Sequence, residues 1–169
     1  RPHRHRPNYR AAIAGADERI WITCPYLVPD EATLLAIRSA AHRGVDVRLL
    51  VPIRGDSRLV AAAVRSYYDD WLACGARVFE YRPAMLHAKT MVVDSKTVYI
   101  GTFNFDPRSE NLNTEVGAII HDEALARAVE ASIETDMAPG NSWDAARDDP
   151  DQHVSLAKRG KVRFYQLLP

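Results

Sequence analysis

The amino-acid sequence predicts an α/β fold in which a mixed, mostly parallel β-sheet lies between helices. In the first half of the chain, apolar segments of strand length alternate with amphipathic segments of helix length. Strands that are joined through a helix pair in parallel, with right-handed crossovers. Shorter strands with tight links follow, so the sheet is expected to be mixed. The length of 169 residues, 47% of them hydrophobic, suits one domain with a sizeable core.

The first strand and the first long helix have clear boundary signals. Residues 19–24 form an apolar run typical of a buried strand, and Pro25 ends it. Asp30 is a good N-cap for a helix that runs through Ala41, and Gly44 can adopt the left-handed conformation that often follows a helix. These signals predict a strand–helix unit at the start of the domain.

The same pattern then repeats. A second strand is expected over residues 45–51 and a third over residues 76–81. The helix between them is expected to begin after Asp56 or Ser57, either of which can cap it, and to run to Ala73. This repeat extends the parallel part of the sheet.

The second half of the domain is expected to contain three shorter strands and one long helix. The strands are predicted over residues 88–93, 97–101 and 114–121. Asp122 can cap the helix, which is predicted to end near Met137.

Both ends of the chain differ in composition from the domain between them. Residues 1–10 contain four Arg and two His without periodicity, and are expected to form a flexible basic arm before a domain over residues 11–137. Residues 138–169 are predicted to form a loop-rich extension with a basic edge strand at residues 162–165. Because the sequence begins with Arg and not with Met, we expect it to be an excerpt of a longer protein.

Composition also bears on partners and compartment. The 22 Lys+Arg residues balance 22 Asp+Glu residues, whereas nonspecific nucleic-acid binding usually needs a basic surplus, so nucleic acid is not an expected partner. The apolar runs are much shorter than a membrane span, which leaves peripheral contact as the expected mode of membrane association. Cys24 and Cys74 form neither a disulfide framework nor a zinc spacing, and are expected to be buried free thiols in a reducing compartment.

One spacing points to chemistry: His87, Lys89 and Asp94 form the pattern H-x-K-x4-D at the start of a predicted strand. Side chains alternate along a strand, so His87 and Lys89 project from one face. Lysine can neutralise the nonbridging oxygens of a phosphate while histidine attacks phosphorus or protonates the leaving oxygen. A structural histidine at a strand edge is the alternative, but a lysine on an apolar strand needs an anionic partner, which phosphate supplies. Asp94 faces the opposite side and is expected to be structural, in a salt bridge or a turn cap.

Further polar residues follow the next predicted strand. Thr102 and Asn104 come after a glycine that permits close backbone approach, and they offer a hydroxyl and an amide to phosphate oxygens. Glu115 leads into the following strand and can hold an imidazole by its second nitrogen. Taken singly, Asn104 can also be a turn residue and Glu115 a strand-edge charge.

Together these motifs resemble the HKD signature of the phospholipase D superfamily. The segments His-Ala-Lys-Thr-Met at 87–91 and Gly-Thr-Phe-Asn-Phe-Asp-Pro-Arg-Ser-Glu-Asn-Leu-Asn-Thr-Glu at 101–115 are similar to the C-terminal half of bacterial cardiolipin synthases and phospholipase-D-like relatives. The turn at 25–29 and the approach at 81–83 are similar too, and the resemblance covers residues 19–137. It implies a phospholipase D-like α/β/α domain.

The resemblance implies phosphodiester exchange without a metal or other cofactor, through a phosphohistidine intermediate. In such a mechanism one histidine forms the intermediate and a second protonates the departing alcohol. Carried over to this sequence, His87 and Lys89 are the motif pair, Thr102 and Asn104 contact phosphate, and Glu115 orients a histidine.

The implied mechanism uses two HKD motifs, and this chain has one. His42, His121 and His153 have no Lys two positions later, so none of them belongs to a second motif. The expected partner is a second HKD half, either the N-terminal half of the same protein or a second copy around a twofold axis. As a C-terminal half, the chain would supply His87 as the general acid and base, whereas in a homodimer each His87 can take either role.

Three functions remain open at this point. The favoured one is a phosphatidyltransferase of the cardiolipin synthase type, acting on a phospholipid such as phosphatidylglycerol, in the cytoplasm and peripheral to the inner face of the cell membrane. The alternatives are a single-motif nuclease or phosphodiesterase that works as a homodimer, and a noncatalytic half that only dimerises. Lipid access would use an apolar rim, for which core packing is the competing interpretation. The rim candidates are Tyr26, Leu27, Met85, Phe103 and Phe105.

Overall fold

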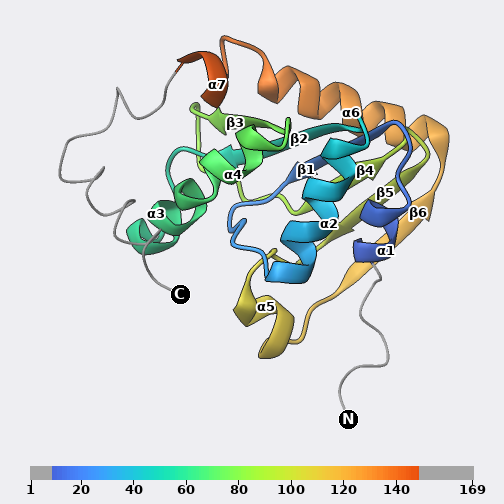
Figure 1. Cartoon of the computed structure of the whole chain (residues 1–169), viewed down its shortest axis with the longest axis horizontal. Helices are drawn as coiled ribbons and strands as arrows, with labels where there is room; N and C mark the ends of the chain where they lie inside the picture. The colour runs from blue at the N-terminus through green and yellow to red at the C-terminus, as the bar shows by residue number, and fades with distance from the viewer. Residues whose placement is uncertain (1–8, 149–169) are drawn as a thin grey trace.

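The computed structural model describes residues 9–148 of the chain. Most of the predicted basic arm and the edge strand predicted at residues 162–165 lie outside the described residues. The described part forms one seven-stranded sheet with helices on both faces, so the predicted α/β class is confirmed (Figure 1).

The strands lie in the order β6-β5-β4-β1-β2-β3-β7 across the sheet. Their bounds are β1 Arg19–Thr23, β2 Asp46–Pro52, β3 Arg77–Tyr81, β4 Thr90–Val93, β5 Thr97–Gly101, β6 Gly117–His121 and β7 Ser142–Asp144. Only β1–β2 and β2–β3 pair in parallel among these strands, and the other four pairings are antiparallel. The expectation of a mostly parallel sheet is therefore wrong. The β4–β5 link spans just three residues, too few for the crossover that a parallel pair needs.

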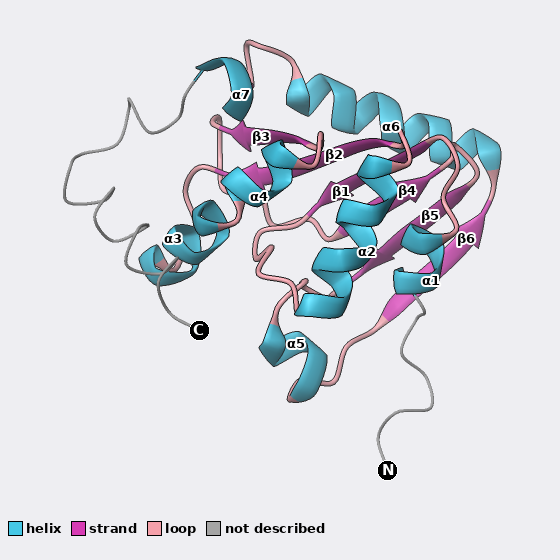
Figure 2. Cartoon of the chain, in the orientation of Figure 1, coloured by secondary structure: helices cyan, strands magenta, loops and turns pink. Residues whose placement is uncertain are grey.

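The helices cover the two faces unequally. Their bounds are α1 Tyr9–Ala14, α2 Glu31–His42, α3 Arg58–Ser66, α4 Tyr68–Ala73, α5 Pro107–Asn111, α6 Glu123–Met137 and α7 Ala145–Asp148. The long helix α6 lies on one face, and α1, α2 and α4 lie on the other (Figure 2). The larger core cluster lies under α1, α2 and α4 and includes Ile22, Leu49 and Trp71, all fully buried. The smaller cluster lies under α6 and includes Trp21 and Ile133.

Two helices begin at the capping residues that the sequence predicts, Asp30 and Asp122. The Asp30 carboxylate accepts a hydrogen bond from the Thr33 backbone N–H at 2.9 Å, and Asp122 accepts one from the Leu125 N–H at 2.8 Å. Gly44, after α2, has a φ of +90°, a conformation that a side chain would disfavour. Capping thus fixes where α2 and α6 begin.

The helix predicted to end at Ala73 is divided in two. Ser57, not Asp56, caps α3, which ends at Ser66, and α4 begins at Tyr68. The Ser66 hydroxyl donates to the Ala63 carbonyl oxygen at 2.6 Å, a local bond that competes with regular helix.

The domain extends beyond both predicted boundaries. Tyr9, assigned by sequence to the arm, is buried in α1 and packs against Phe103 and Phe105. After residue 137, the predicted loop instead contains β7, which pairs antiparallel with β3, and the short helix α7. An ion pair of 2.8 Å between Arg77 and Asp144 adds to this pairing. A three-residue strand is too short to show the alternation on which its prediction would depend.

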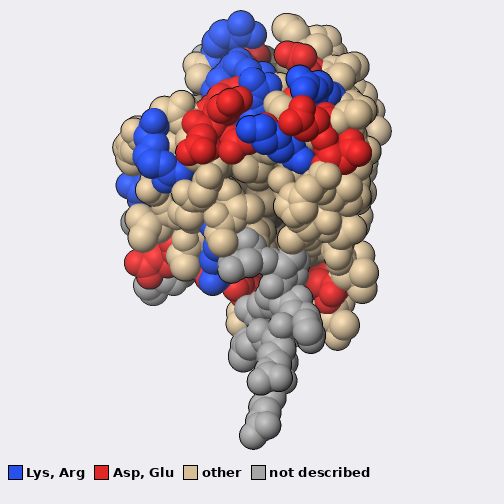
Figure 3. All heavy atoms as spheres, turned by 90° about the vertical axis from the view of Figure 1, so that its right-hand side faces the viewer, with Lys and Arg blue, Asp and Glu red and all other residues tan. Residues whose placement is uncertain are grey.

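Within residues 9–148, β6 forms the opposite edge of the sheet. β6 pairs with β5 on one side, and Ile119 in this strand is 46% exposed. Figure 3 shows this side of the molecule, where charged side chains of both signs gather over the upper part and uncharged surface prevails below. Among residues 9–148, no helix is long and apolar enough to span a membrane.

Candidate active site

His87 and Lys89 lie at the edge of the sheet where β1 ends and β4 begins. The predicted strand starts later than expected, at Thr90, so both motif residues belong to the extended segment just before it. The Lys89 ammonium nitrogen is nevertheless 3.0 Å from His87 Nδ1, and it donates to the His87 carbonyl oxygen at 2.8 Å. The structure thus brings the two side chains together, as the alternation predicts. Gly101 at the end of β5 holds this segment by donating its N–H to the Lys89 carbonyl oxygen at 3.1 Å.

The two side chains differ sharply in exposure. His87 is exposed, whereas Lys89 retains 9% of its surface accessible to solvent. Burial lowers the pKa of Lys89, and the nearby Cys24 and the carboxylates of Glu115, Asp56 and Asp106 partly oppose this effect. Because burial leaves this ammonium poorly hydrated, it is well placed to gain from an incoming phosphate.

Glu115, which is predicted to orient a histidine, is hydrogen-bonded to polar neighbours within the described residues. Its carboxylate accepts hydrogen bonds from the Thr102 hydroxyl and from the Asn113 amide, the latter at 3.1 Å. Glu115 precedes β6 while Thr102 follows β5, so the antiparallel pairing of these strands brings the two residues close together. Burial alone would raise the pKa of Glu115. Hydrogen bonds, led by that from Thr102, and the charge of Lys89 outweigh this effect, so the pKa lies below its ordinary value.

The two predicted phosphate contacts differ in availability. The Thr102 hydroxyl is exposed but engaged, because it donates to Glu115 and accepts from the Val116 N–H at 3.0 Å. Asn104 is 9% exposed, and its Oδ1 has no hydrogen-bond partner within the described part of the chain. The ends of a side-chain amide can exchange by rotation, so Asn104 can present either its oxygen or its NH₂ group to a ligand. Of the two residues, Asn104 has the unused hydrogen-bonding capacity.

Two residues beside the imidazole complete the site. The Tyr26 ring packs edge-on against His87, with ring centroids 6.2 Å apart and planes at 85°. The Tyr26 hydroxyl donates to Asp56, and this hydrogen bond, with burial, raises the pKa of Tyr26 to about 12. Sequence reasoning considered Asp56 only as a helix cap. No local pattern identifies it as a site residue, because the fold of the loop after β2 brings it there.

The aromatic rim predicted for lipid access is largely part of the core. Phe103 and Phe105 are 6% and 4% exposed and stack on each other and on Tyr9. Leu27 is also buried, whereas Met85 is 46% exposed. The substrate-lining role predicted for Phe103 and Phe105 is therefore wrong, because α1 covers their side of the sheet.

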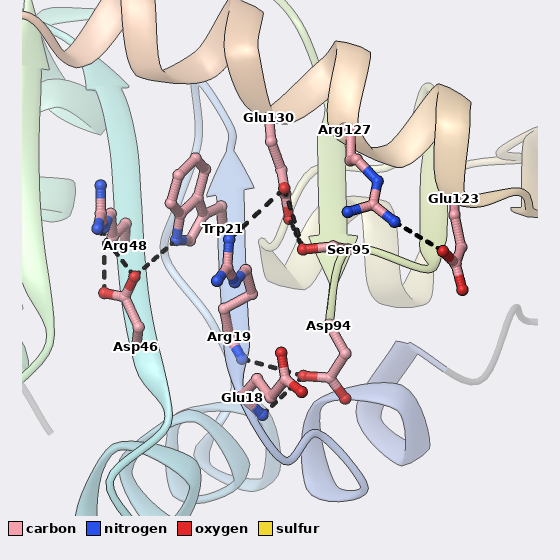
Figure 4. Close-up of polar contacts among 10 residues, drawn as sticks. All are labelled: Glu18, Arg19, Trp21, Asp46, Arg48, Asp94, Ser95, Glu123, Arg127 and Glu130. Carbon is pink, nitrogen blue, oxygen red and sulfur yellow. Dashed lines mark hydrogen bonds and ion pairs between the residues drawn. The ribbon is translucent and has the colours of Figure 1, made fainter.

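Asp94 lies at the far end of β4, away from His87 and Lys89. Its carboxylate accepts hydrogen bonds from the backbone N–H groups of Asp17, Glu18 and Arg19, at 2.8–3.1 Å. Figure 4 shows those from Glu18 and Arg19. Burial raises the pKa of Asp94, but these three donors, led by that of Arg19, bring it below its ordinary value. The residue joins the β4–β5 turn, where its φ is +52°, to the start of β1.

Other charged side chains at that end are linked by ion pairs and hydrogen bonds. Glu130 on α6 accepts from the Ser95 hydroxyl at 2.8 Å and lies 3.6 Å from Arg19 (Figure 4). Over residues 9–148, no group of three or more His, Cys, Asp or Glu side chains is arranged to hold a metal ion. Cys24 and Cys74 are both buried and free, as predicted.

Comparison with known proteins agrees with this fold. Residues 9–137 match the family described as cardiolipin synthase, PLD-like domain. The chain is 49% identical over 126 residues to cardiolipin synthase A of Pseudomonas aeruginosa (strain LESB58), covering 75% of this chain and 26% of that protein. It is 43% identical over 129 residues to cardiolipin synthase 2 of Bacillus anthracis, covering 76% of this chain and 25% of that protein.

A solved structure shows the same architecture. The phospholipase D family member Nuc from Salmonella typhimurium superposes with a TM-score of 0.67 at 26% identity, covering 80% of this chain and 86% of that one. The chain spans about a quarter of the length of the cardiolipin synthases that it matches. The family match covers most of the chain and includes both His87 and Lys89. The chain therefore belongs to the cardiolipin synthase family of phospholipase D-like domains.

Proposed function

We propose that the chain is the one-motif, C-terminal half of a phosphatidyltransferase of the cardiolipin synthase type, which exchanges phosphodiesters through a phosphohistidine. The observation that carries this proposal is the contact between the exposed imidazole of His87 and the nearly buried ammonium of Lys89. Cardiolipin synthases at up to 50% identity support the lipid class of the substrate.

In the proposed reaction, a neutral imidazole attacks the phosphorus of a phospholipid. A P–N bond forms while the P–O bond to the departing alcohol breaks, and the second histidine of the site protonates the oxygen that leaves. An acceptor alcohol then attacks phosphorus, gives its proton to that second histidine, and returns the P–N electron pair to the ring. One phosphodiester replaces another, so the exchange needs no oxidant, reductant or energy source.

Lys89 acts on the nonbridging oxygens in both steps. Its ammonium lies 3.0 Å from His87 Nδ1, so the oxygens of a phosphate that contacts the imidazole lie within reach of the lysine. Burial of Lys89 strengthens this interaction because little water competes for the charge. Asn104 is the second candidate contact, since rotation of its side-chain amide would put the NH₂ donor where the buried oxygen has no partner within residues 9–148.

The second histidine comes from another HKD half in this proposal. In the longer relatives the remaining three quarters of the chain offers room for it. With an N-terminal half as partner, His87 serves as the general acid and base, and the partner's histidine serves as the nucleophile.

A second candidate is a single-motif phosphodiesterase or nuclease that works as a homodimer. The coverage of Nuc favours it, because this chain matches 86% of a phospholipase D family member of similar size. The chemistry at His87 and Lys89 is the same in this case, and the substrate differs.

A lipid substrate requires access to a membrane surface, so we place the enzyme at the inner face of the cell membrane, in peripheral contact. Two buried free thiols support a reducing, cytoplasmic compartment.

The direct test is to trap the intermediate. The chain and its partner half are incubated with phosphatidylglycerol labelled in its phosphate and quenched in alkali, where a phosphohistidine survives although acid destroys it. We expect label on protein that disappears when the nucleophilic histidine is replaced, and loss of turnover in His87→Ala. Turnover that is unchanged in folded His87→Ala would refute the proposal.

A further inference from the structure

A cavity of about 330 Å³ lies between α6 and residues 86–90, which contain His87 and Lys89 and are called the catalytic segment below. This volume is within the range of small-molecule sites. The cavity is bounded by Leu86, Ala88 and Thr90 from the catalytic segment, by Thr23 at the end of β1, and by residues of α6 such as Val129 and Ile133. None of these residues takes part in the proposed chemistry.

The cavity lies on the other side of the backbone from the catalytic pair. The side chains of His87 and Lys89 contact each other, whereas those of Leu86 and Ala88 line the cavity. This alternation is that of an extended chain, in which neighbouring side chains point to opposite sides. A ligand whose phosphate is held at His87 can therefore enter the cavity by passing around the edge of this segment.

Thr23 supplies a hydrogen-bond donor that the protein leaves unused. Its side chain is 3% exposed, and its hydroxyl has no hydrogen-bond partner within residues 9–148. An unpaired buried hydroxyl is unfavourable, so it favours a ligand that offers an acceptor oxygen.

The remaining lining selects against a charged ligand group. It is mostly apolar, through residues such as Leu86, Val129 and Ile133, and it contains no Lys or Arg. Asp136 at the cavity is an acid, which disfavours a phosphate there. An uncharged, largely apolar group with an acceptor oxygen fits both conditions.

We propose that this cavity binds the acyl-ester end of the phospholipid whose phosphate is held at His87 and Lys89. The ester carbonyl accepts a hydrogen bond from Thr23, and the start of the acyl chain packs against Val129 and Ile133. The short glycerol backbone links the two groups around the edge of the catalytic segment. This inference rests on the proposed function and extends it to the diacylglycerol part of the substrate.

The test measures binding to the whole chain by calorimetry, with three probes. They are dihexanoyl phosphatidylglycerol below its micelle concentration, its dihexyl ether analogue, which lacks the carbonyl oxygens, and glycerophosphoglycerol, which lacks the acyl chains. We expect the ester lipid to bind most tightly and Thr23→Val to weaken it about fivefold, as the loss of one neutral hydrogen bond predicts. Thr23→Val should leave the affinity for the ether lipid unchanged and should not lower the melting temperature, because it removes a hydroxyl without a partner.

A second variant fills the cavity from its exposed rim. Ala128→Phe, on α6, should weaken binding of the ester lipid about tenfold and leave glycerophosphoglycerol unaffected. The matched control is Ala131→Phe, an exposed residue of the same helix that does not line the cavity, and it should bind as the unmodified chain does.

The outcomes separate this inference from the proposed function. If lipid affinity depends on Lys89 but not on Thr23 or Ala128, the acyl-ester site is refuted and the proposed function stands. If no probe binds, or Lys89→Ala has no effect on any of them, both are refuted.

Discussion

At the scale of single residues, Lys89 combines a charge that we propose to bind phosphate with a buried position that is unfavourable for a cation. Burial lowers its pKa, which means that the folded state disfavours the ammonium form. We expect Lys89→Met to reduce phosphatidyl transfer at least about 100-fold, since it removes a charge from the transition state. The free energy of unfolding should stay equal or rise, because an apolar side chain of similar length replaces a buried cation. Urea unfolding and transfer assays on the two proteins check this pair of results.

The pH dependence of that stability difference follows from the sign of the shift. Between the folded pKa of Lys89 and its ordinary value of 10.5, the unfolded chain binds more protons than the folded protein. The free energy of unfolding therefore gains a contribution that rises with pH in this alkaline window, and Lys89→Met lacks it. The amount by which the free energy of unfolding of Lys89→Met exceeds that of the unmodified chain should therefore shrink as pH increases. An advantage that grows with pH would contradict the burial of this charge.

Asp94 acts on how secondary-structure elements are joined. Its carboxylate accepts three backbone N–H groups at the start of β1 and so ties that strand to the β4–β5 turn. We expect Asp94→Ala to cost about 1–2 kcal/mol of unfolding free energy near neutral pH, as for the loss of charged hydrogen bonds at a partly exposed site. Chemical denaturation measures this cost, and phosphatidyl transfer, which in our proposal uses His87 and Lys89 near the other end of β4, should persist in the folded variant.

The Asp94 contribution also has a defined pH window. Because its pKa is lowered in the folded state, the contribution is fully present above the ordinary value of 3.8 and is lost as pH falls through the folded pKa. The difference between the unmodified chain and Asp94→Ala should therefore narrow in acid. Loss of catalysis in a stable Asp94→Asn variant would show that the residue does more than join these elements.

The pairing of β5 with β6 depends on two facing glycines. Gly101 and Gly117 are partners in the register, and both lie against Tyr99. A Cβ at Gly117 would lie 2.6 Å from the Tyr99 ring, whereas one at Gly101 would lie 2.6 Å from both the Tyr99 hydroxyl and the Val116 carbonyl oxygen. We expect either Gly101→Ala or Gly117→Ala to lower the free energy of unfolding by about 1–3 kcal/mol.

A double-mutant cycle distinguishes the two glycines. Tyr99→Val should recover much of the cost of Gly117→Ala, because the nearest atoms all belong to Tyr99. It should recover little of the cost of Gly101→Ala, because the Val116 carbonyl belongs to the backbone. Equal recovery at both positions, measured by thermal unfolding, would mean that the backbone shifts freely at this edge.

What the sequence predicts depends on whether a signal is local. Alternation places His87 beside Lys89, and capping residues such as Asp30 mark helix starts, because both effects act within a few residues. The partner of Glu115 depends instead on how β5 and β6 align, and the approach of Asp56 depends on the fold of a loop. Phe103 is limited in the same way, because the sequence pattern around an apolar side chain is the same whether α1 or a lipid covers it.

At the scale of the whole molecule, the positive and negative charges are balanced, and several of them form ion pairs. The net charge is zero, and Arg48, Arg65, Arg77 and Arg127 each form an ion pair with a carboxylate. On the side shown in Figure 3, acidic and basic side chains are interspersed and form no continuous basic stripe. Such a surface offers little to a polyanion, whose binding relies on release of counterions from many phosphates.

This distribution of charged side chains leads to a binding test that distinguishes the proposed lipid enzyme from the alternative nuclease. We expect no measurable binding of a random DNA duplex by the whole chain, even at low ionic strength, whereas short-chain phosphatidylglycerol binds in the same buffer through Lys89. Fluorescence anisotropy of labelled duplex, with Lys89→Ala as the matched control for the shared phosphate site, makes the comparison. Duplex binding that weakens steeply with added salt, and that is lost in Lys89→Ala, would favour the homodimeric nuclease. A single phosphodiester site can bind one phosphate of either substrate, so the surface around it, and not the HKD pair, decides between them.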